Sequence, residues 1–381
     1  MKVAIIGDCN SIFIKQYIEY VLLNDEVVLL AENSVNSHYR LFYERHNIKV
    51  LPLYGGMRKW MRGIPFFRSR VAAFFWSKAA IRFMKHFDCV HIHALNQLRG
   101  YLGECLRKKT DNLIISIWGS ELLGRNTKYL KSLTPYYGMA NHITLESEKM
   151  IDTFKQVYGS AFNGKLTKTV LFLGIFDYMD VISHQSGPKE LCDFFNIKSY
   201  DKWKVFVGHN GREVQRHFAI TDELEKLPQE IKDKIVLVYT MTYGCPDSSY
   251  LMSLKEKANN SGCESVFIED YLTEEGIAKL RLICDILIHA QPTDAASASV
   301  RECLYGGSIV VNGDWLRYDF IPDYEKRLIE YSDLKEVPGI ITDIISNNEK
   351  YQTMRQYNKG NRDGAPSSIE ISEAWRKLII S

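Results

Sequence analysis

The chain has 381 residues, 46% of them hydrophobic and 25% charged, with a formal net charge of +2. This length exceeds what one hydrophobic core normally organises, so two domains are expected. The near-neutral charge provides no general attraction to nucleic acid, and no nucleic-acid partner is expected. The eight cysteines stand singly, without a Cys-x-x-Cys pair. They are typical of reduced core residues in a cytoplasmic protein.

The N-terminus begins with an apolar strand over residues 1–8 and lacks the h-region of a signal peptide. No run of about 18 apolar residues occurs, so no membrane span is expected. These two features predict a cytoplasmic protein.

The first half alternates short apolar runs with amphipathic patterns. Helices are predicted over residues 11–23 and 34–46. Strands are predicted over residues 1–8, 26–31, 50–53, 89–94, 113–117 and 142–145. Such alternation is typical of a doubly wound parallel sheet in the α/β class.

A change of pattern near Val170 predicts a strand over residues 170–179 and a linker over the polar, proline-bearing residues 183–189. The strand and helix alternation then restarts. Further strands are predicted over residues 203–208, 235–240, 265–268, 286–288 and 308–311. The resulting domains are residues 1–182 and 190–365. A C-terminal helix in 366–381 exceeds the needs of the second sheet and is a candidate to cross back to the first domain.

The most informative stretch is DILIHAQPTDAASASVRECLYGGSIVVNG, residues 285–313. A buried strand leads into a turn, a helix, a Gly306-Gly307 stop and a second strand, and the turn and helix carry Asp294 and Glu302. Carboxylates accept hydroxyl donors, and an anion is favoured at a helix N-terminus. The alternative is an N-cap aspartate and an ordinary surface glutamate.

This stretch resembles that of the GT-B glycosyltransferases, in particular the retaining, family-4-like enzymes. Their pair of glutamates, with seven residues between them, is similar to Asp294-x7-Glu302, with an aspartate in the first position. The resemblance implies two Rossmann-like domains facing a cleft. It also implies catalytic roles for both carboxylates: Glu302 on the ribose of the nucleotide, and Asp294 with Ser297 and Ser299 on the donor sugar.

The second block, VGHNGREVQRHF over residues 207–218, begins the second sheet. Glycines allow close approach to a pyrophosphate, and arginines neutralise it. Gly211, Arg212 and Arg216 are therefore the diphosphate candidates; the alternative is a glycine turn with solvated arginines. The chain has no Asp-x-Asp motif, so neither a metal nor another cofactor is expected.

This block, with Tyr243-Gly244-Cys245-Pro246 and residues 312–318, also looks like the lipid-linked 4-acetamido-4,6-dideoxygalactose transferases. Those enzymes invert the anomeric centre, whereas the first resemblance implies retention, so the stereochemistry stays open. The resemblance to GT-B enzymes places the nucleobase near Tyr243 and Asp270-Tyr271-Leu272. The alternative for these residues is plain loop.

Residues that close strands of the first domain are expected on the acceptor side. Glu121, His93 or Asp8 could orient or deprotonate an acceptor hydroxyl. Of these, His93 is the candidate general base, and the alternative is a core histidine. The other acceptor-side candidates are Gly7, Asn10, Trp118, Gly119 and Glu121.

Residues 57–86 combine eight lysines and arginines with seven aromatic residues and contain no acidic residue. Such a segment suits an anionic membrane surface and hence peripheral association. The alternative is an amphipathic helix whose aromatic residues fill the first core.

Together these patterns predict a metal-independent hexosyltransferase that uses a nucleotide-diphosphate sugar. The acceptor is a saccharide or polyprenyl-linked saccharide of bacterial surface polysaccharide such as lipopolysaccharide or capsule. Two alternatives remain: a nucleotide-sugar 2-epimerase of GT-B fold, and a non-catalytic nucleotide-binding partner of a glycan assembly complex.

Overall fold

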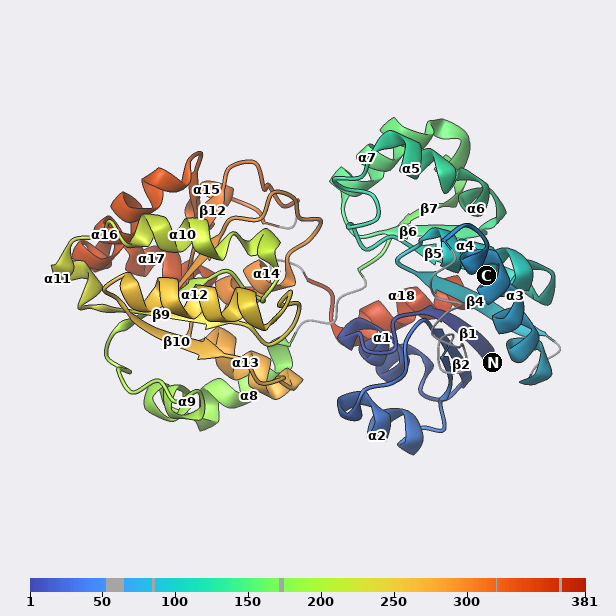
Figure 1. The fold of residues 1–381 in the computed structure, drawn as a ribbon, viewed down its shortest axis with the longest axis horizontal. Coiled ribbons are helices and arrows are strands. Elements are labelled where there is room, and N and C mark those ends of the chain that lie inside the picture. The colour runs from blue at the N-terminus through green and yellow to red at the C-terminus, as the bar shows by residue number, and fades with distance from the viewer. Residues whose placement is uncertain (53–64, 84–85, 171–174, 320, 363–364) are drawn as a thin grey trace. The chain divides into compact units, whose positions relative to one another are not determined.

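The computed structural model describes residues 1–381 except 53–64, 84–85, 171–174, 320 and 363–364 (Figure 1). The chain forms two compact units. Unit 1 consists of Met1–Leu173 and Pro366–Ser381, and unit 2 of Gly174–Ala365.

Unit 1 is built on a seven-stranded sheet in the order β3-β2-β1-β4-β5-β6-β7, paired in parallel throughout. The central strands are apolar along their length because helices cover both faces of a parallel sheet. The strands are β1 Lys2–Gly7, β2 Glu26–Ala31, β3 Lys49–Pro52, β4 Phe87–His93, β5 Thr110–Ser116, β6 His142–Leu145 and β7 Leu166–Lys168.

Several unit 1 helices begin at a side chain that accepts a backbone N–H, which satisfies donors that the first turn leaves free. The first helix continues into a π-helical turn, Ile18–Leu22. The helices are α1 Ile12–Tyr17, α2 Ser37–Arg45, α3 Pro65–Phe83, α4 Gln97–Leu106, α5 Thr127–Ser132, α6 Thr134–Met139 and α7 Glu148–Tyr158.

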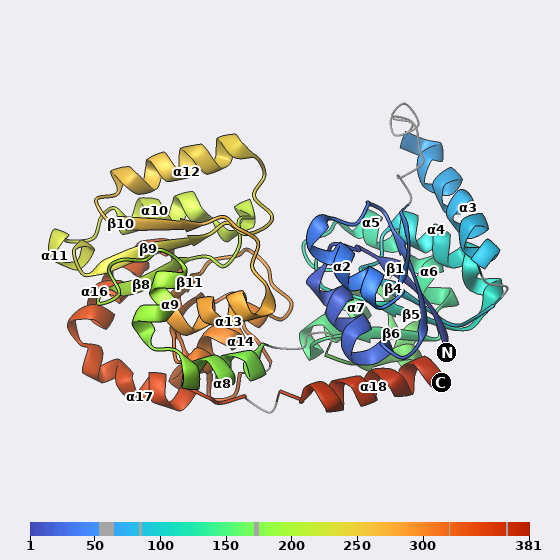
Figure 2. The ribbon, with the colours of Figure 1, turned by 90° about the horizontal axis from the view of Figure 1, so that it is seen from below.

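The C-terminal helix α18, Ser368–Ile380, belongs to unit 1 and contacts the π-helical turn, β4 and β5 (Figure 2). Trp375 is 1% exposed, and its indole N–H donates to the Val170 carbonyl at 3.0 Å. Arg376 forms an ion pair with the buried carboxylate of Asp25. The helix therefore completes the core of unit 1.

Unit 2 is built on a six-stranded parallel sheet in the order β10-β9-β8-β11-β12-β13. The strands are β8 Trp203–Val207, β9 Ile235–Thr240, β10 Glu264–Ile268, β11 Ile286–His289, β12 Ile309–Gly313 and β13 Ile329–Tyr331. The helices are α8 Phe176–Gln185, α9 Pro188–Phe194, α10 His217–Leu224, α11 Gln229–Lys232, α12 Ser248–Asn260, α13 Glu274–Ile283, α14 Ala298–Gly306, α15 Tyr324–Arg327, α16 Val337–Ser346 and α17 Asn348–Asn358.

The predicted strand over residues 170–179 is wrong where the structure describes it, because helix α8 begins at Phe176. Residues 171–174 of that prediction lie outside the described residues. The buried residues Phe176, Met179 and Ile182 follow one helix face, and a short apolar run does not distinguish strand from helix by itself. The short edge strands β7 and β13 were not predicted.

The predicted linker over residues 183–189 is also wrong. Residues 183–185 finish α8, and Pro188 opens α9, where a proline is tolerated because the first helical N–H has no partner. Helix α8 packs against α13 within unit 2. The two units divide at 173/174 rather than between residues 182 and 190.

Both sheets reverse their strand order beside their first strand, between β1 and β4 in unit 1 and between β8 and β11 in unit 2. In open α/β sheets, ligands bind at this switch point, outside the carboxyl ends of the strands. Among the described residues, no helix is both long and apolar enough to cross a membrane.

Candidate functional site

The switch point of unit 2 lies between two loops that the sequence analysis selected. Residues 208–216 follow β8, and residues 290–297 follow β11, which pairs with β8 in parallel. Because parallel neighbours end at the same edge, both loops leave the sheet side by side. The diphosphate candidates and Asp294 are therefore on adjacent loops.

The loop after β8 is held rigidly by its own hydrogen bonds. The Gly211 N–H donates to the Tyr243 carbonyl at 2.9 Å, and the Arg212 N–H donates to the Asn210 side chain at 2.9 Å. A Cβ on Gly211 would lie 2.9 Å from the Cys245 backbone nitrogen, so only glycine fits. These amides are occupied, and the loop presents side chains rather than a cradle of free backbone N–H groups.

Arg212 extends from this loop and is exposed. Its stem lies against Gly244, where an added Cβ would approach the Arg212 Cγ to 2.5 Å. The guanidinium forms no hydrogen bond or ion pair with any described residue. It therefore keeps all its donors for a ligand.

Arg216 is exposed and adopts a left-handed conformation, φ 62°, directly before α10. Its charge lowers the pKa of Tyr331, at the end of β13, although burial of that tyrosine has the larger, opposite effect. Arg216 thus also lies at the carboxyl edge, toward β13.

Glu302 forms a buried ion pair with Arg281 of α13. Arg281 Nε donates to Glu302 Oε2 at 3.0 Å, and each side chain is only 6% exposed. Burial raises the pKa of Glu302, and the adjacent Arg281 opposes that rise. The alternative of a surface glutamate is therefore wrong.

Arg281 was not predicted, although an arginine on the apolar pattern of residues 277–284 was a detectable signal. Its Nη2 donates to the Ser299 hydroxyl at 2.8 Å, while Nη1 is buried without a hydrogen-bond partner. Ser299 thus positions Arg281. Charged groups are expensive to bury, so an arginine held this firmly with a free donor fits an anionic ligand.

Other buried polar atoms without a partner gather at the same edge. Within the described part of unit 2 they are His209 Nδ1, Gln215 Nε2, Thr240 Oγ1 and Arg281 Nη1. Buried polar atoms are nearly always hydrogen-bonded, so such a concentration indicates a ligand or ordered water.

Asp294 lies in a polar cluster before α14. Its Oδ2 accepts from Gln291 Nε2 and from the Tyr318 hydroxyl, each at 3.1 Å, and lies 3.5 Å from His289 Nε2. The cap of α14 is Ser297, whose hydroxyl accepts from the Val300 N–H at 3.3 Å. The alternative of Asp294 as the N-cap is therefore wrong.

His289 and His209 relate the position of Asp294 to that of Arg281 and Arg212. The His289 Nδ1 lies 3.0 Å from Asn312 Oδ1, and its ring stacks on that of His209 with centroids 5.5 Å apart. Burial lowers the pKa of His209, and the charges of His289, Arg281 and Arg212 lower it further. Asp294, the Glu302–Arg281 pair and Arg212 are consequently brought to one region of unit 2.

The nucleobase candidates lie on neighbouring loops. Tyr243 follows β9, is 53% exposed, and its hydroxyl accepts from Asn210 Nδ2 at 3.4 Å. Asp270 and Tyr271 are exposed between β10 and α13. Leu272 is partly buried and packs against Gly276 and the core.

In unit 1, Gly7 allows β1 to end close to β4, because an added Cβ would lie 3.0 Å from Ile14 Cδ1 and 3.5 Å from His93 Cβ. Asn10 holds the segment before α2: its Oδ1 accepts from the Asn36 N–H at 2.8 Å, and its Nδ2 donates to the Ser34 carbonyl. Both residues therefore shape the carboxyl edge of the sheet of unit 1.

His93 is fully buried, and neither ring nitrogen has a hydrogen-bond partner. Its ring packs between His91, 3.9 Å away, and Tyr17, 4.9 Å away between centroids. Burial, then the charges of His91 and Arg99, lower the pKa of His93 far below its usual range. The side chain is a neutral imidazole and a weak base.

Glu121 closes the turn that contains Trp118 and Gly119. Its Oε1 accepts from the Trp118 N–H at 2.7 Å, and Gly119 has φ 115°. Burial raises the pKa of Glu121, which is 5% exposed. The carboxylate stabilises its own turn.

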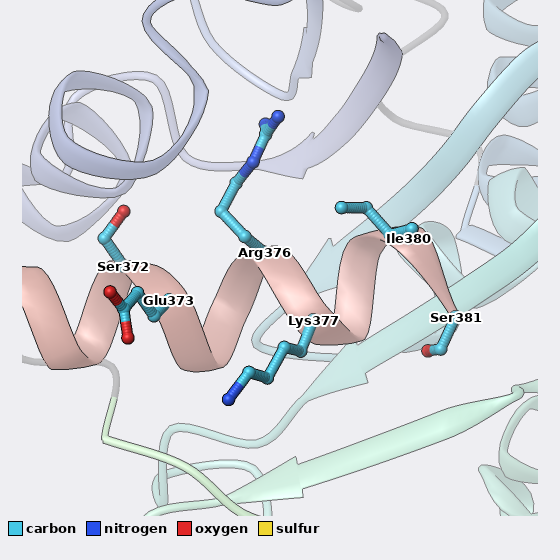
Figure 3. Close-up of a pocket in the computed structure, with 6 residues that line it drawn as sticks. All are labelled: Ser372, Glu373, Arg376, Lys377, Ile380 and Ser381. Carbon is cyan, nitrogen blue, oxygen red and sulfur yellow. The ribbon is translucent and has the colours of Figure 1, made fainter.

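A shallow pocket of about 470 Å³ lies elsewhere, on α18 of unit 1 (Figure 3). Ser372 and Arg376 already bond to the π-helical side of unit 1, and none of the predicted residues lines this pocket. Its lining residues are Ser372, Glu373, Arg376, Lys377, Ile380 and Ser381. No cluster of three potential metal ligands occurs among the described residues.

No protein-family model matches the sequence, and no curated protein matches it. Similarity is found among solved structures. HepE of Anabaena in complex with UDP and glucose has a TM-score of 0.74 at 12% identity, over 100% of this chain and 99% of that one. A glycosyltransferase of Rickettsia africae has a TM-score of 0.71 at 12% identity, over 99% and 98%.

An α,α-trehalose-phosphate synthase (UDP-forming) of Burkholderia xenovorans in complex with glucose-6-phosphate has a TM-score of 0.68 at 7% identity, over 100% of both chains. These identities are low, so the similarity concerns the fold. The chain has the α/β fold of the GT-B type, built from two Rossmann-like units.

Proposed function

We propose that the chain is a glycosyltransferase that moves a hexose from a nucleotide-diphosphate donor to a saccharide acceptor. The observation that carries this proposal is the pair of arginines at the switch point of unit 2. Arg212 has no partner among the described residues, and Arg281 keeps a buried, unpartnered Nη1. The structures of HepE with UDP and with UDP-glucose support the choice of ligand class.

The diphosphate would bind to Arg212 and Arg281, with Arg216 at the periphery. Arginine suits this role because its planar donors match phosphate oxygens and it stays charged. Negative charge grows on the diphosphate as the sugar leaves. Each well-placed donor then contributes about 2.7–4 kcal/mol in the transition state.

Glu302 would serve both the protein and the donor. A carboxylate has about four acceptor positions, so its bond to Arg281 leaves room for ribose hydroxyls. Asp294 would face the transferred sugar, whereas the hydroxyls of Ser297 and Ser299 are occupied by the N-cap and by Arg281. The nucleobase would lie near Tyr243, Asp270 and Tyr271.

We propose retention of configuration, with the departing phosphate accepting the proton of the acceptor hydroxyl. Inversion needs a protein base, and the candidates of unit 1 suit that role poorly. The lowered pKa of His93 makes it a weak base, and Glu121 is bonded to its own turn.

The acceptor would bind at the carboxyl edge of unit 1, near Trp118. We propose a saccharide or polyprenyl-linked saccharide of bacterial surface polysaccharide assembly. The resemblance to lipid-linked acetamido-sugar transferases supports this choice. We expect no metal cofactor, so EDTA should leave turnover unchanged.

The first test is a thermal-shift panel of UDP, GDP, TDP and their sugars on the full chain. We expect protection by one nucleotide and its sugar, and anomeric NMR of the product then reports retention. Absence of protection by every nucleotide would overturn the proposal. Conversion of the donor without acceptor would identify an epimerase, and protection without any transfer would identify a binding partner.

A further inference from the structure

Helix α3 is packed against unit 1 by its small residues. Over residues 70–83, the buried positions include Ala72, Ala73, Ser77 and Ala80, together with Trp76, which is 3% exposed. These positions face α4, which lies beside α3 (Figure 2). Small side chains allow the two helices to approach closely, so the buried face needs few bulky apolar groups.

The opposite face carries the bulky ones. Phe74 is 49% exposed, Phe75 56% and Ile81 37%. With Val71 and the cations Lys78 and Arg82 they recur every three or four residues, so all project from one side of the helix. A solvent-facing helix surface normally carries polar residues, and this one instead alternates phenylalanine and isoleucine with cations.

The helix itself carries charge of one sign. The sequence contains no aspartate or glutamate from residue 45 to residue 87. Lys78 Nζ lies 4.4 Å from the centroid of the Phe74 ring, and Arg70 extends over Tyr101 of α4 at 5.0 Å. The cations therefore stand among the exposed rings rather than apart from them.

We propose that this face of α3 binds an anionic lipid bilayer, with the helix lying in the plane of the interface. The rings would enter the boundary between headgroups and acyl chains, while the flexible stems of Lys78 and Arg82 keep their charges among anionic headgroups. A bilayer of uncharged lipid would accommodate the aromatic rings but would offer no anionic partner to the cations. This surface lies outside the donor site and does not depend on the function proposed for it.

A second copy of the chain is a poorer occupant. In a two-fold interface the same patch meets itself, so Lys78 and Arg82 would face the cations of the partner helix, which carries no acidic residue of its own. Like charges at an interface oppose association, whereas an anionic bilayer supplies the opposite charge.

The test is co-sedimentation of the full chain with vesicles of phosphatidylcholine alone or with 30% phosphatidylglycerol. We expect binding to the anionic vesicles only, weakening as salt rises. Lys78→Glu/Arg82→Glu should lower the partition coefficient by at least about tenfold, because two charges that attract anionic headgroups are replaced by two that are repelled. Phe74→Ser/Phe75→Ser should lower it at every salt concentration.

Matched controls distinguish this face from general surface effects. Lys128→Glu/Lys131→Glu removes two exposed lysines of α5, and Leu41→Ser removes an apolar side chain that is 54% exposed on α2. Both should bind as the unchanged chain does. Equal binding by the α3 variants would overturn the proposal, as would a dimer that Phe74→Ser/Phe75→Ser dissociates without any vesicle binding. Circular dichroism and thermal melts verify that each variant is folded.

Discussion

The two sheets have equivalent strands at their switch points, but different residues surround the ends of these strands. Strand β4 of unit 1 and β11 of unit 2 each pair with the first strand of their sheet. Each is anchored by an aspartate: Asp88 accepts from the Lys2 N–H at 2.7 Å, and Asp285 accepts from the Lys204 N–H at 2.9 Å. Each ends in histidine followed by alanine, at His93 and at His289.

The environments of these histidines differ. His289 is surrounded by polar partners, with Asp294 and Asn312 raising its pKa against the larger lowering effect of burial. His93 is enclosed by rings, and nothing in its surroundings opposes that lowering. The same backbone position thus supports a charged, hydrogen-bonded edge in unit 2 and an aromatic edge in unit 1. This difference is the physical reason to place the anionic donor on unit 2.

The largest effect should come from removing the charge that unit 2 buries. Arg281→Met leaves the Glu302 carboxylate buried without its ion-pair partner and should lower the free energy of unfolding by about 3–5 kcal/mol. Denaturant unfolding measures it. Adding Glu302→Gln should recover most of the loss. Lys279→Met on the same helix removes a surface pair with Glu275 and a contact with the exposed Phe194 ring, and should cost less than about 1 kcal/mol.

Removing the free arginine of unit 2 should impair the reaction rather than the fold. Arg212→Met should reduce kcat/KM by about 10²–10³-fold, equivalent to about 2.7–4 kcal/mol, and abolish nucleotide protection in thermal melts. Arg40→Met, an exposed arginine of α2 in unit 1, is the control and should change neither. Unchanged protection in Arg212→Met would remove this residue from the site.

The two histidines should contribute unequally to the dependence of stability on pH. The pKa of His93 is lower in the folded than in the unfolded chain, so the unfolded chain binds more protons below about pH 6.5. The stability that His93 contributes to the fold is complete above that pH and is lost as the pH falls. His93→Leu should reduce the slope of the free energy of unfolding against pH by up to about 1.4 kcal/mol per pH unit. His289→Leu should reduce this slope less, because Asp294 opposes the lowering of the His289 pKa. Equal flattening in urea titrations at pH 5–7 would contradict the comparison.

A smaller effect should follow from Gly244→Ala. Its φ of 78° strains any other residue by roughly 1–2 kcal/mol, and the new Cβ would displace Arg212. Gly159→Ala also places an alanine at positive φ, 74°, with no atom within 4 Å of the new Cβ. Both variants should lose stability, whereas only Gly244→Ala should weaken nucleotide protection. Equal protection by the nucleotide in both variants would show that the contact of the Arg212 side chain with Gly244 does not position this arginine for binding.

The exposed face of α3 shows how an amphipathic pattern alone can leave two outcomes open. The alternative that its aromatic residues fill the core holds for Trp76 and fails for Phe74, Phe75 and Phe83. Residues 57–64 and 84–85 of the predicted segment lie outside the described residues.

The sequence by itself determined the alternation of strands and helices, and with it both parallel sheets apart from the short edge strands β7 and β13, and the loops that carry Arg212 and Asp294. It could do so because buried parallel strands are short continuous apolar runs, and because glycines and polar residues cluster where such strands end.

Only the tertiary structure decided the partners. The burial of Glu302, the role of Ser299 and the position of Arg281 depend on α13 and α14 packing together, which no local pattern encodes. The start of α8 at Phe176 and the packing of α18 on unit 1 also depend on tertiary contacts. An apolar stretch shows that a face will be buried, but which surface buries it depends on contacts between residues far apart in the chain.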